Sequence, residues 1–344
     1  MKCPKCSYNQ SYNNGMICNR CKYRFILDPK RDGFADNKFV TTISSLLQQG
    51  MGFFTFHQFY AMLYKRSKKT NPLFVGIAVA LMVSFMVISM SERAAISIGF
   101  GLIIGVLTYI GIKSSQSKAP AVYKIQKLWN RWLEKTVIPV DGYLSLPEFT
   151  IAPEQTANSD WYDYGVEGLL IVDQPIYVDL LVKNKIHSEY RLLVMASDTY
   201  PHFLLEQANK LLSERKDLPV YLLHNATANV KSMTDRFALQ GHAIYDLGLS
   251  LKVYETHPRL KPFSSLLEKP LDVLSLNAMR LLLRRATDTV NEEQGDGYSD
   301  GGWIFWDDTS DWDDDAESGG RILVSEPLFD EAMEDGDADG GDFG

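Results

Sequence analysis

The sequence predicts an α/β protein built from an N-terminal zinc-binding module, a two-helix transmembrane hairpin, an open parallel-sheet cytoplasmic domain and a disordered acidic tail. Three observations predict this fold class. Four cysteines at metal-ligand spacing open the chain, two long apolar runs without a charge follow, and short apolar segments then alternate with segments of helical periodicity. The 344 residues are enough for two or three modules.

All four cysteines lie near the start of the chain as two Cys-x-x-Cys pairs, Cys3 with Cys6 and Cys18 with Cys21. Two such pairs can present four thiolates to one zinc ion in a tetrahedron. The alternative is two disulfides. Disulfides form in oxidising compartments, whereas the charges around the apolar runs, described below, predict that this module lies in the reducing cytoplasm. Because four cysteines leave no position open for water or substrate, they predict a structural zinc and not a catalytic one.

This spacing resembles the zinc ribbon found at the start of many bacterial membrane proteins, and the resemblance covers residues 1–28. It implies a zinc ribbon as the first domain. Five basic side chains give this module a positive surface: Lys2, Lys5, Arg20, Lys22 and Arg24. Such a surface fits nucleic acid, lipid headgroups or a protein partner, and it also fits a module that is simply solvated.

Residues 36–70 are expected to form a helical linker of two short helices. Asp36 can cap the first helix with its carboxylate. Thr55 and Gln58 stand three residues apart in the capping-box pattern, which marks the start of the second helix. His57 is expected at the surface and not in a metal site, because no partner lies near it in the sequence.

Two apolar runs, residues 72–90 and 94–112, each span 19 residues without a charge. A helix of that length is about 28 Å long, close to the hydrocarbon thickness of a bilayer. Residues 72–112 therefore predict a transmembrane hairpin with a three-residue loop. The alternative is a buried helical hairpin inside a soluble protein.

The charges around the apolar runs predict their orientation. Lysines and arginines flank both outer ends, so both termini are expected in the cytoplasm and the chain in the inner (plasma) membrane, in contact with its lipid. Within the second run, Gly101 and Gly105 form a small-xxx-small pattern. This pattern allows close helix contact, either inside the hairpin or between two copies in a homodimer.

Residues 119–165 are expected to hold an amphipathic helix and a linker, and residues 166–290 an open α/β domain. The helix, 121–135, carries two tryptophans among basic residues, which suits a membrane headgroup layer or packing on the domain behind it. In the domain, short apolar strands alternate with helices, which is typical of a parallel sheet covered on both faces. The strands are expected at 169–172, 190–195, 220–223 and 243–247, and the helices at 175–185, 201–215, 228–239 and 271–285.

Polar residues stand at the carboxyl ends of these strands, where ligands bind in open α/β folds. Asp173, Asp198, His224 and Asp246 each end or follow one predicted strand. The three aspartates are candidates to hold a metal ion, since carboxylate oxygens suit hard divalent cations. The alternative is that these loops are polar for solubility and helix capping.

Two segments resemble parts of a Toprim domain: residues 169–181 resemble its first strand and helix, and residues 222–231 a later strand and loop. The resemblance implies the α/β fold, with a Glu after the first strand as general acid or base and two acids in the later loop as magnesium ligands. Asp173 stands at the position of the Glu, and His224 and Ala226 at the positions of the two acids. This departure removes the magnesium ligands, so the resemblance supports the fold more than the activity.

The last part of the chain, residues 291–344, holds 19 acidic residues and one basic residue, Arg321, for a net charge of −18. Residues 1–290 carry +10. A segment so acidic and so rich in Gly is expected to be disordered, because it cannot bury enough apolar surface to offset the entropy of ordering. Two apolar islands, 303–306 and 322–324, suggest that it docks on a partner or folds back on the basic body. The alternative is a solubilising tail.

These features predict a membrane-tethered cytoplasmic binding or scaffold protein with a structural zinc and a non-catalytic α/β domain. A protein partner would bind through the α/β domain or the acidic tail. The alternative function is a membrane-bound, metal-dependent hydrolase or nuclease that uses Asp173 and Asp198, with His224 nearby.

Overall fold

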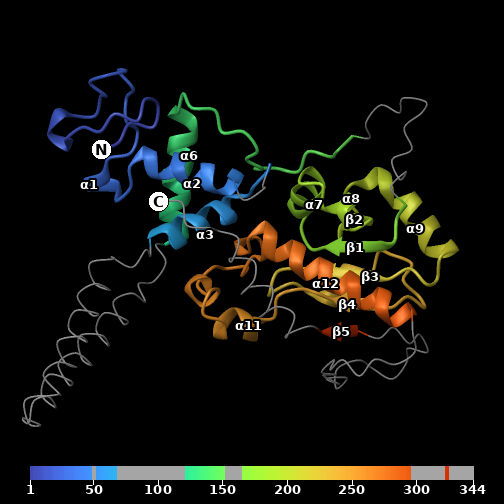
Figure 1. Cartoon of the computed structure of the whole chain (residues 1–344). Coiled ribbons are helices and arrows are strands. Elements are labelled where there is room, and N and C mark those ends of the chain that lie inside the picture. The colour runs from blue at the N-terminus through green and yellow to red at the C-terminus, as the bar shows by residue number, and fades with distance from the viewer. Residues whose placement is uncertain (49–51, 68–120, 152–164, 296–321, 325–344) are drawn as a thin grey trace, which may run out of the picture.

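The computed structural model describes residues 1–48, 52–67, 121–151, 165–295 and 322–324 (Figure 1). The predicted transmembrane hairpin, 72–112, lies outside this part of the chain, together with Gly101 and Gly105 and most of the acidic tail.

One finding corrects the predicted fold class. Among the residues described, no helix is both long and apolar enough to cross a membrane. The longest of them, α12 (Leu276–Gly295), has 20 residues, but Arg280, Arg284 and Asp288 interrupt it with charge. The structure is an α/β fold with a parallel sheet and an N-terminal cysteine cluster, and this finding overturns both the membrane-spanning fold class and the inner-membrane location.

The sheet has five parallel strands in the order β2-β1-β3-β4-β5. Its strands are β1 (Gly168–Val172), β2 (Leu192–Ala196), β3 (Val220–Leu223), β4 (Ile244–Asp246) and β5 (Ile322–Val324). The first four lie within two residues of their predicted positions. The fifth comes from an apolar island of the tail, where the sequence predicts disorder. Its three residues pair with β4 in parallel. The composition of the tail cannot predict this pairing, because the partner strand lies far away in the sequence.

Both faces of the sheet are covered, because every residue of β1, β2 and β3 is buried. Alternate β1 side chains enter two different clusters, as the period of a strand requires. Leu169 and Ile171 pack with α9 (Leu205–Glu214) and α10 (Val230–Thr234). Leu170 and Val172 belong to a second cluster, which includes α12 and two further helices, α7 (Pro175–Lys183) and α8 (Ile186–Glu189).

Several helices are shorter than predicted. The helix expected at 175–185 ends early because Lys185 adopts a left-handed φ of 63°, and the chain then restarts as α8. The helix expected at 201–215 begins with a 3-10 turn, His202–Leu204, before α9. A short helix, α11 (Leu251–Thr256), follows β4.

The N-terminal part forms a separate group of helices at one end of the molecule (Figure 1). These are α1 (Pro29–Asp32), α2 (Asp36–Gln48), α3 (Phe56–Ser67) and α6 (Val122–Lys135). An aromatic core joins them: the ring centroids of Phe59 and Trp129 are 4.1 Å apart, and those of Trp129 and Trp132 are 5.8 Å apart. Both tryptophans are fully buried, so α6 packs on its neighbours with the face that carries them.

The capping box predicted for the second helix is present. The Thr55 backbone N–H donates to Gln58 Oε1 over 3.1 Å, and the Gln58 N–H donates to Thr55 Oγ1 over 3.4 Å. This reciprocal pair fixes the first turn of α3.

One buried asparagine clamps the helical part to the α/β domain. Asn184 Oδ1 accepts the N–H groups of Gly52 and Phe53 over 2.8 and 3.1 Å, and Asn184 Nδ2 donates to the Phe53 carbonyl over 2.9 Å. A single hydrophobic cluster also runs from Phe39 in α2 to Leu283 in α12. The two parts are therefore held together by a continuous core as well as by polar contacts.

We predict that Asn184→Ala destabilises the fold by about 1–3 kcal/mol, because it removes three hydrogen bonds to the partly buried backbone of Gly52 and Phe53. Denaturant unfolding of the full chain would measure this. The matched control is Asn130→Ala on the exposed side of α6, which should change the free energy of unfolding by less than about 0.5 kcal/mol. Equal effects of the two substitutions would contradict the clamp.

Candidate metal centre and the carboxyl edge of the sheet

The four cysteines converge on one point. Their sulfur atoms all lie within 4.8 Å of one another. Cys3 Sγ is 3.5 Å from Cys21 Sγ, and Cys6 Sγ is 3.7 Å from Cys18 Sγ. Sulfurs that bind zinc at about 2.3 Å in a tetrahedron are about 3.8 Å apart, whereas a disulfide requires about 2.05 Å. The spacing fits four thiolates around one metal ion, and all four cysteines are free.

Two equivalent turns create this geometry. The Ser7 N–H donates to the Cys3 carbonyl, and the Lys22 N–H donates to the Cys18 carbonyl, each over 2.9 Å. Ser7 and Lys22 both adopt a left-handed φ, near 60°, directly after the second cysteine of each pair. The backbone therefore bends sharply at the same place in both pairs, so each turn brings its two sulfurs to the shared centre.

The protein environment shifts the thiol pKa values in opposite directions. The hydrogen bond from the Cys21 backbone N–H lowers the pKa of Cys18 to about 6. Burial raises the pKa of Cys3 to about 12. A bound metal ion would deprotonate all four thiols, so binding would release protons and weaken as the pH falls.

A buried carboxylate attaches the cysteine module, residues 1–28, to the helices. Asp36 Oδ2 accepts the Tyr23 hydroxyl over 3.0 Å and the Ile26 N–H over 2.8 Å, and Asp36 Oδ1 accepts the Leu27 N–H over 2.8 Å. Asp36 is 0% exposed, and burial raises its pKa. The sequence predicts a helix cap for Asp36; the carboxylate instead accepts hydrogen bonds from residues 23–27, which follow the cysteines.

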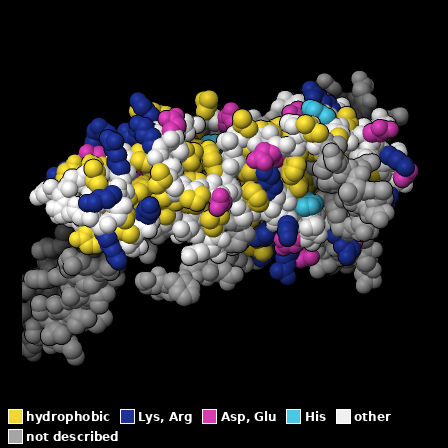
Figure 2. Space-filling view, turned by 90° about the horizontal axis from the view of Figure 1, so that it is seen from above, with side chains coloured by type: hydrophobic (Ala, Val, Ile, Leu, Met, Phe, Trp, Pro, Cys, Tyr) yellow, Lys and Arg dark blue, Asp and Glu magenta, His cyan; other side chains and the backbone are white. Residues whose placement is uncertain are grey.

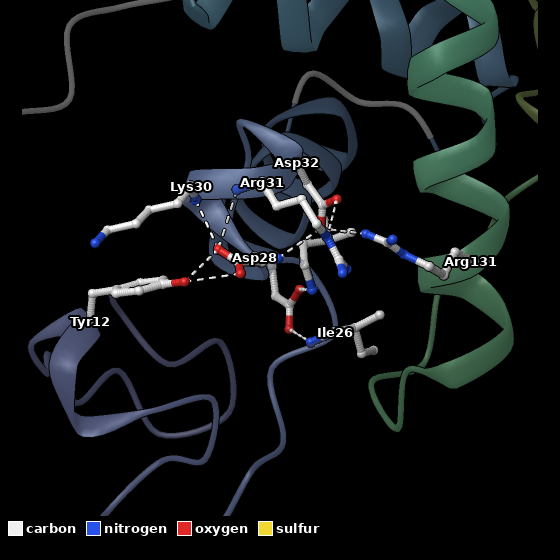
Figure 3. A network of polar contacts seen from close by, with 9 residues as sticks. Tyr12, Ile26, Asp28, Lys30, Arg31, Asp32 and Arg131 are labelled. Atoms are coloured by element: carbon white, nitrogen blue, oxygen red, sulfur yellow. Dashed lines mark hydrogen bonds and ion pairs between the residues drawn. The ribbon is translucent and has the colours of Figure 1, made fainter.

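Two further aspartates extend this attachment, as Figure 3 shows. Asp28 caps α1 by accepting the Lys30 N–H over 2.9 Å, and it also accepts the Tyr12 hydroxyl over 2.9 Å. Asp32 forms an ion pair with Arg131, which comes from α6. The module is thus tied to α1, α2 and α6 by three carboxylates, and its position does not depend on one flexible linker.

The carboxyl edge of the sheet brings together most of the other predicted site residues. The Asn225 N–H donates to Asp173 Oδ2 over 3.1 Å, and His224 Nε2 lies 3.0 Å from Asp246 Oδ1. Asp198 does not join them: it is exposed and closes a turn by accepting the Tyr200 N–H over 3.1 Å. In the described part of the chain, the cysteines form the one group of three or more candidate ligands that lies close enough to hold a metal ion.

His224 is held by acceptors on both sides. Its Nδ1 lies 2.7 Å from the Asn225 carbonyl, and its Nε2 faces Asp246. Burial acts to lower the pKa of His224, but the Asp246 carboxylate and the Asn225 carbonyl outweigh it and raise the pKa above its ordinary value. Since both ring nitrogens are engaged, His224 has no free nitrogen for general-base catalysis in this arrangement. Gly248 lies directly against the ring, where a Cβ would come within 2.2 Å of Nε2.

The environment of Asp173 disfavours its charged form. Its Oδ1 is buried and has no hydrogen-bond partner among the described residues. Burial raises the pKa of Asp173 to about 6, although the Asn225 N–H and the charge on His224 act against it. The ionised carboxylate therefore lowers the stability of the folded protein. Among the described residues, Asp173 is not part of a group of acids close enough to hold a metal ion.

Sequence reasoning missed a buried network behind this edge. The Tyr177 hydroxyl donates to Asn225 Oδ1 over 2.7 Å, and His57 Nδ1 lies 3.0 Å from Asp272 Oδ1. His57 was expected at the surface without a partner, yet it contacts an aspartate 215 residues away. The one signal in the sequence is that Asp272 is an acid inside the apolar stretch 271–274. Such an acid is usually buried with a partner.

No family model, curated protein or solved structure matches this chain. The resemblances to a zinc ribbon and to a Toprim domain therefore remain predictions.

We predict that Asp173→Asn stabilises the protein at pH 8 by up to about 3 kcal/mol. The folded-state pKa of about 6 lies above the unfolded value of about 3.9, so the ionised side chain costs stability above pH 6 and the cost disappears as the pH falls toward 4. Denaturant unfolding at pH 4 and pH 8 would measure the difference. The matched control, Asp198→Asn, changes an exposed aspartate and should change the free energy of unfolding by less than about 0.5 kcal/mol. A loss of stability in Asp173→Asn at pH 8 would refute this account.

Proposed function

We propose that the chain is a binding or scaffold protein in which a zinc ribbon is carried on a non-catalytic α/β body. The convergence of four thiols within 4.8 Å carries this proposal. Soft thiolate ligands in a tetrahedron favour zinc, and four protein ligands leave no open coordination position. The zinc would stabilise the module and would not activate water.

The carboxyl edge of the sheet supports a structural role for its polar residues. Two-metal hydrolysis needs carboxylates that share metal ions about 4 Å apart. Asp198 turns away from Asp173 to close its own loop, and His224 is engaged on both nitrogens. These contacts favour the binding function over the hydrolase or nuclease alternative.

The cysteine module offers the surface that a partner would use. Its five basic residues are all exposed, and residues 1–27 contain no acid. A zinc ion with four thiolates carries −2, so the occupied module would keep a net charge of about +3. Figure 2 shows Lys and Arg side chains gathered at the end of the molecule that holds the N-terminal part. A polyanionic partner fits this surface.

Metal analysis tests the proposal. The purified full chain should hold one zinc per molecule, and Cys18→Ser should lose it. Hydrogen exchange should then rise in the module around Tyr23 and Phe25, which pack against the cysteines, while the sheet stays protected. The matched controls Asp173→Asn and Asp198→Asn should keep the zinc. Absence of zinc, or a magnesium-dependent turnover that Asp173→Asn abolishes, would overturn the proposal.

A further inference from the structure

The basic residues of the cysteine module lie in a stretch of chain without acids, because residues 1–27 contain no Asp or Glu. We call Lys2, Lys5, Arg20, Lys22 and Arg24 the module cations. All five are exposed, and none forms an ion pair with a described residue. Elsewhere in the described part of the chain, several cations pair directly with acids: Arg131 with Asp32, Lys183 with Glu148, Arg191 with Glu167, and Arg280 with Glu189. The module therefore carries an unbalanced positive charge.

The chain itself contains a matching negative charge. Residues 325–344 include eight acids and no lysine or arginine. They follow β5, whose pairing with β4 fixes the start of this segment on the sheet. Fully extended, 20 residues reach about 70 Å, and a compact body of about 230 residues is about 45 Å across. The segment is long enough to reach the module.

We infer that the module cations form a docking surface for the acidic segment 325–344 of the same chain. The inference rests on the proposed function, because the surface exists only when the module is folded around its metal. Attachment through β5 gives the segment a high effective concentration at the module, so even weak ionic contacts lead to occupancy. The segment would then exclude other polyanions from the surface, and a partner would bind by displacing it.

Zero-length carbodiimide crosslinking of the full, zinc-loaded chain tests this directly. Amide bonds should form between carboxylates of 325–344 and the amines of Lys2, Lys5 or Lys22. The matched control is Lys216, an exposed lysine on the α/β domain, whose crosslinks should be several-fold fewer. Raising the salt to 0.5 M should reduce the module crosslinks several-fold, since exposed charges are screened. Equal crosslinking at Lys216 and at the module would overturn the inference.

Binding in trans provides a second test. A labelled peptide of residues 325–344 should bind a chain that ends at residue 324 at least tenfold more tightly than it binds the full chain, whose own segment competes. The triple variant Lys2→Glu, Lys5→Glu, Lys22→Glu should lose this binding while it keeps its zinc. If the truncated chain binds a single-stranded oligonucleotide and not the peptide, or if the full chain binds the peptide equally well, the inference is wrong. Zinc content separates the two proposals, because a metal-free chain refutes the proposed function, whereas a zinc-loaded chain without peptide binding refutes only the docking.

Discussion

The buried carboxylate of Asp36 determines where the cysteine module sits. It accepts hydrogen bonds from three donors of residues 23–27 while it stands at the start of α2. Burying a carboxylate costs free energy unless hydrogen-bond donors surround it. Residues 23–27 must therefore stay against the start of α2 for Asp36 to be buried. The ion pair between Asp32 and Arg131 adds a contact to α6. Together these polar contacts fix the orientation of the cysteine cluster relative to the helices.

Polar side chains also pair with one another at the carboxyl edge of the sheet. The side chains that a parallel fold brings to this edge are the ones that usually meet a ligand. In this chain they mostly meet one another: His224 holds Asp246, and Tyr177 holds Asn225. Asp173 is the exception, with one oxygen left without a partner. The edge therefore joins the loops that follow β1, β3 and β4.

Local signals in the sequence were enough for the cysteine cluster, the first four strands and the capping box of α3. Each depends on residues close together in the chain, such as Thr55 with Gln58. The contacts of His57 with Asp272 and of Gly52 with Asn184 could not be predicted, because they join residues more than 100 positions apart. β5 was missed for the same reason, since a three-residue strand depends on its neighbour. The membrane-spanning fold class, which depended on the hydropathy of residues 72–112 and on their basic flanks, is contradicted by the described structure.

The shared hydrophobic cluster has a consequence for how the protein unfolds and whether it can be divided. Since Phe39 of α2 and Leu283 of α12 belong to one cluster, neither half has a complete interior of its own. A gene fragment that encodes the helical half alone would expose the face of α3 that now packs on the α/β half, where the rings of Tyr60 and Tyr64 contact Phe263. Heating should therefore melt the two halves in a single cooperative transition.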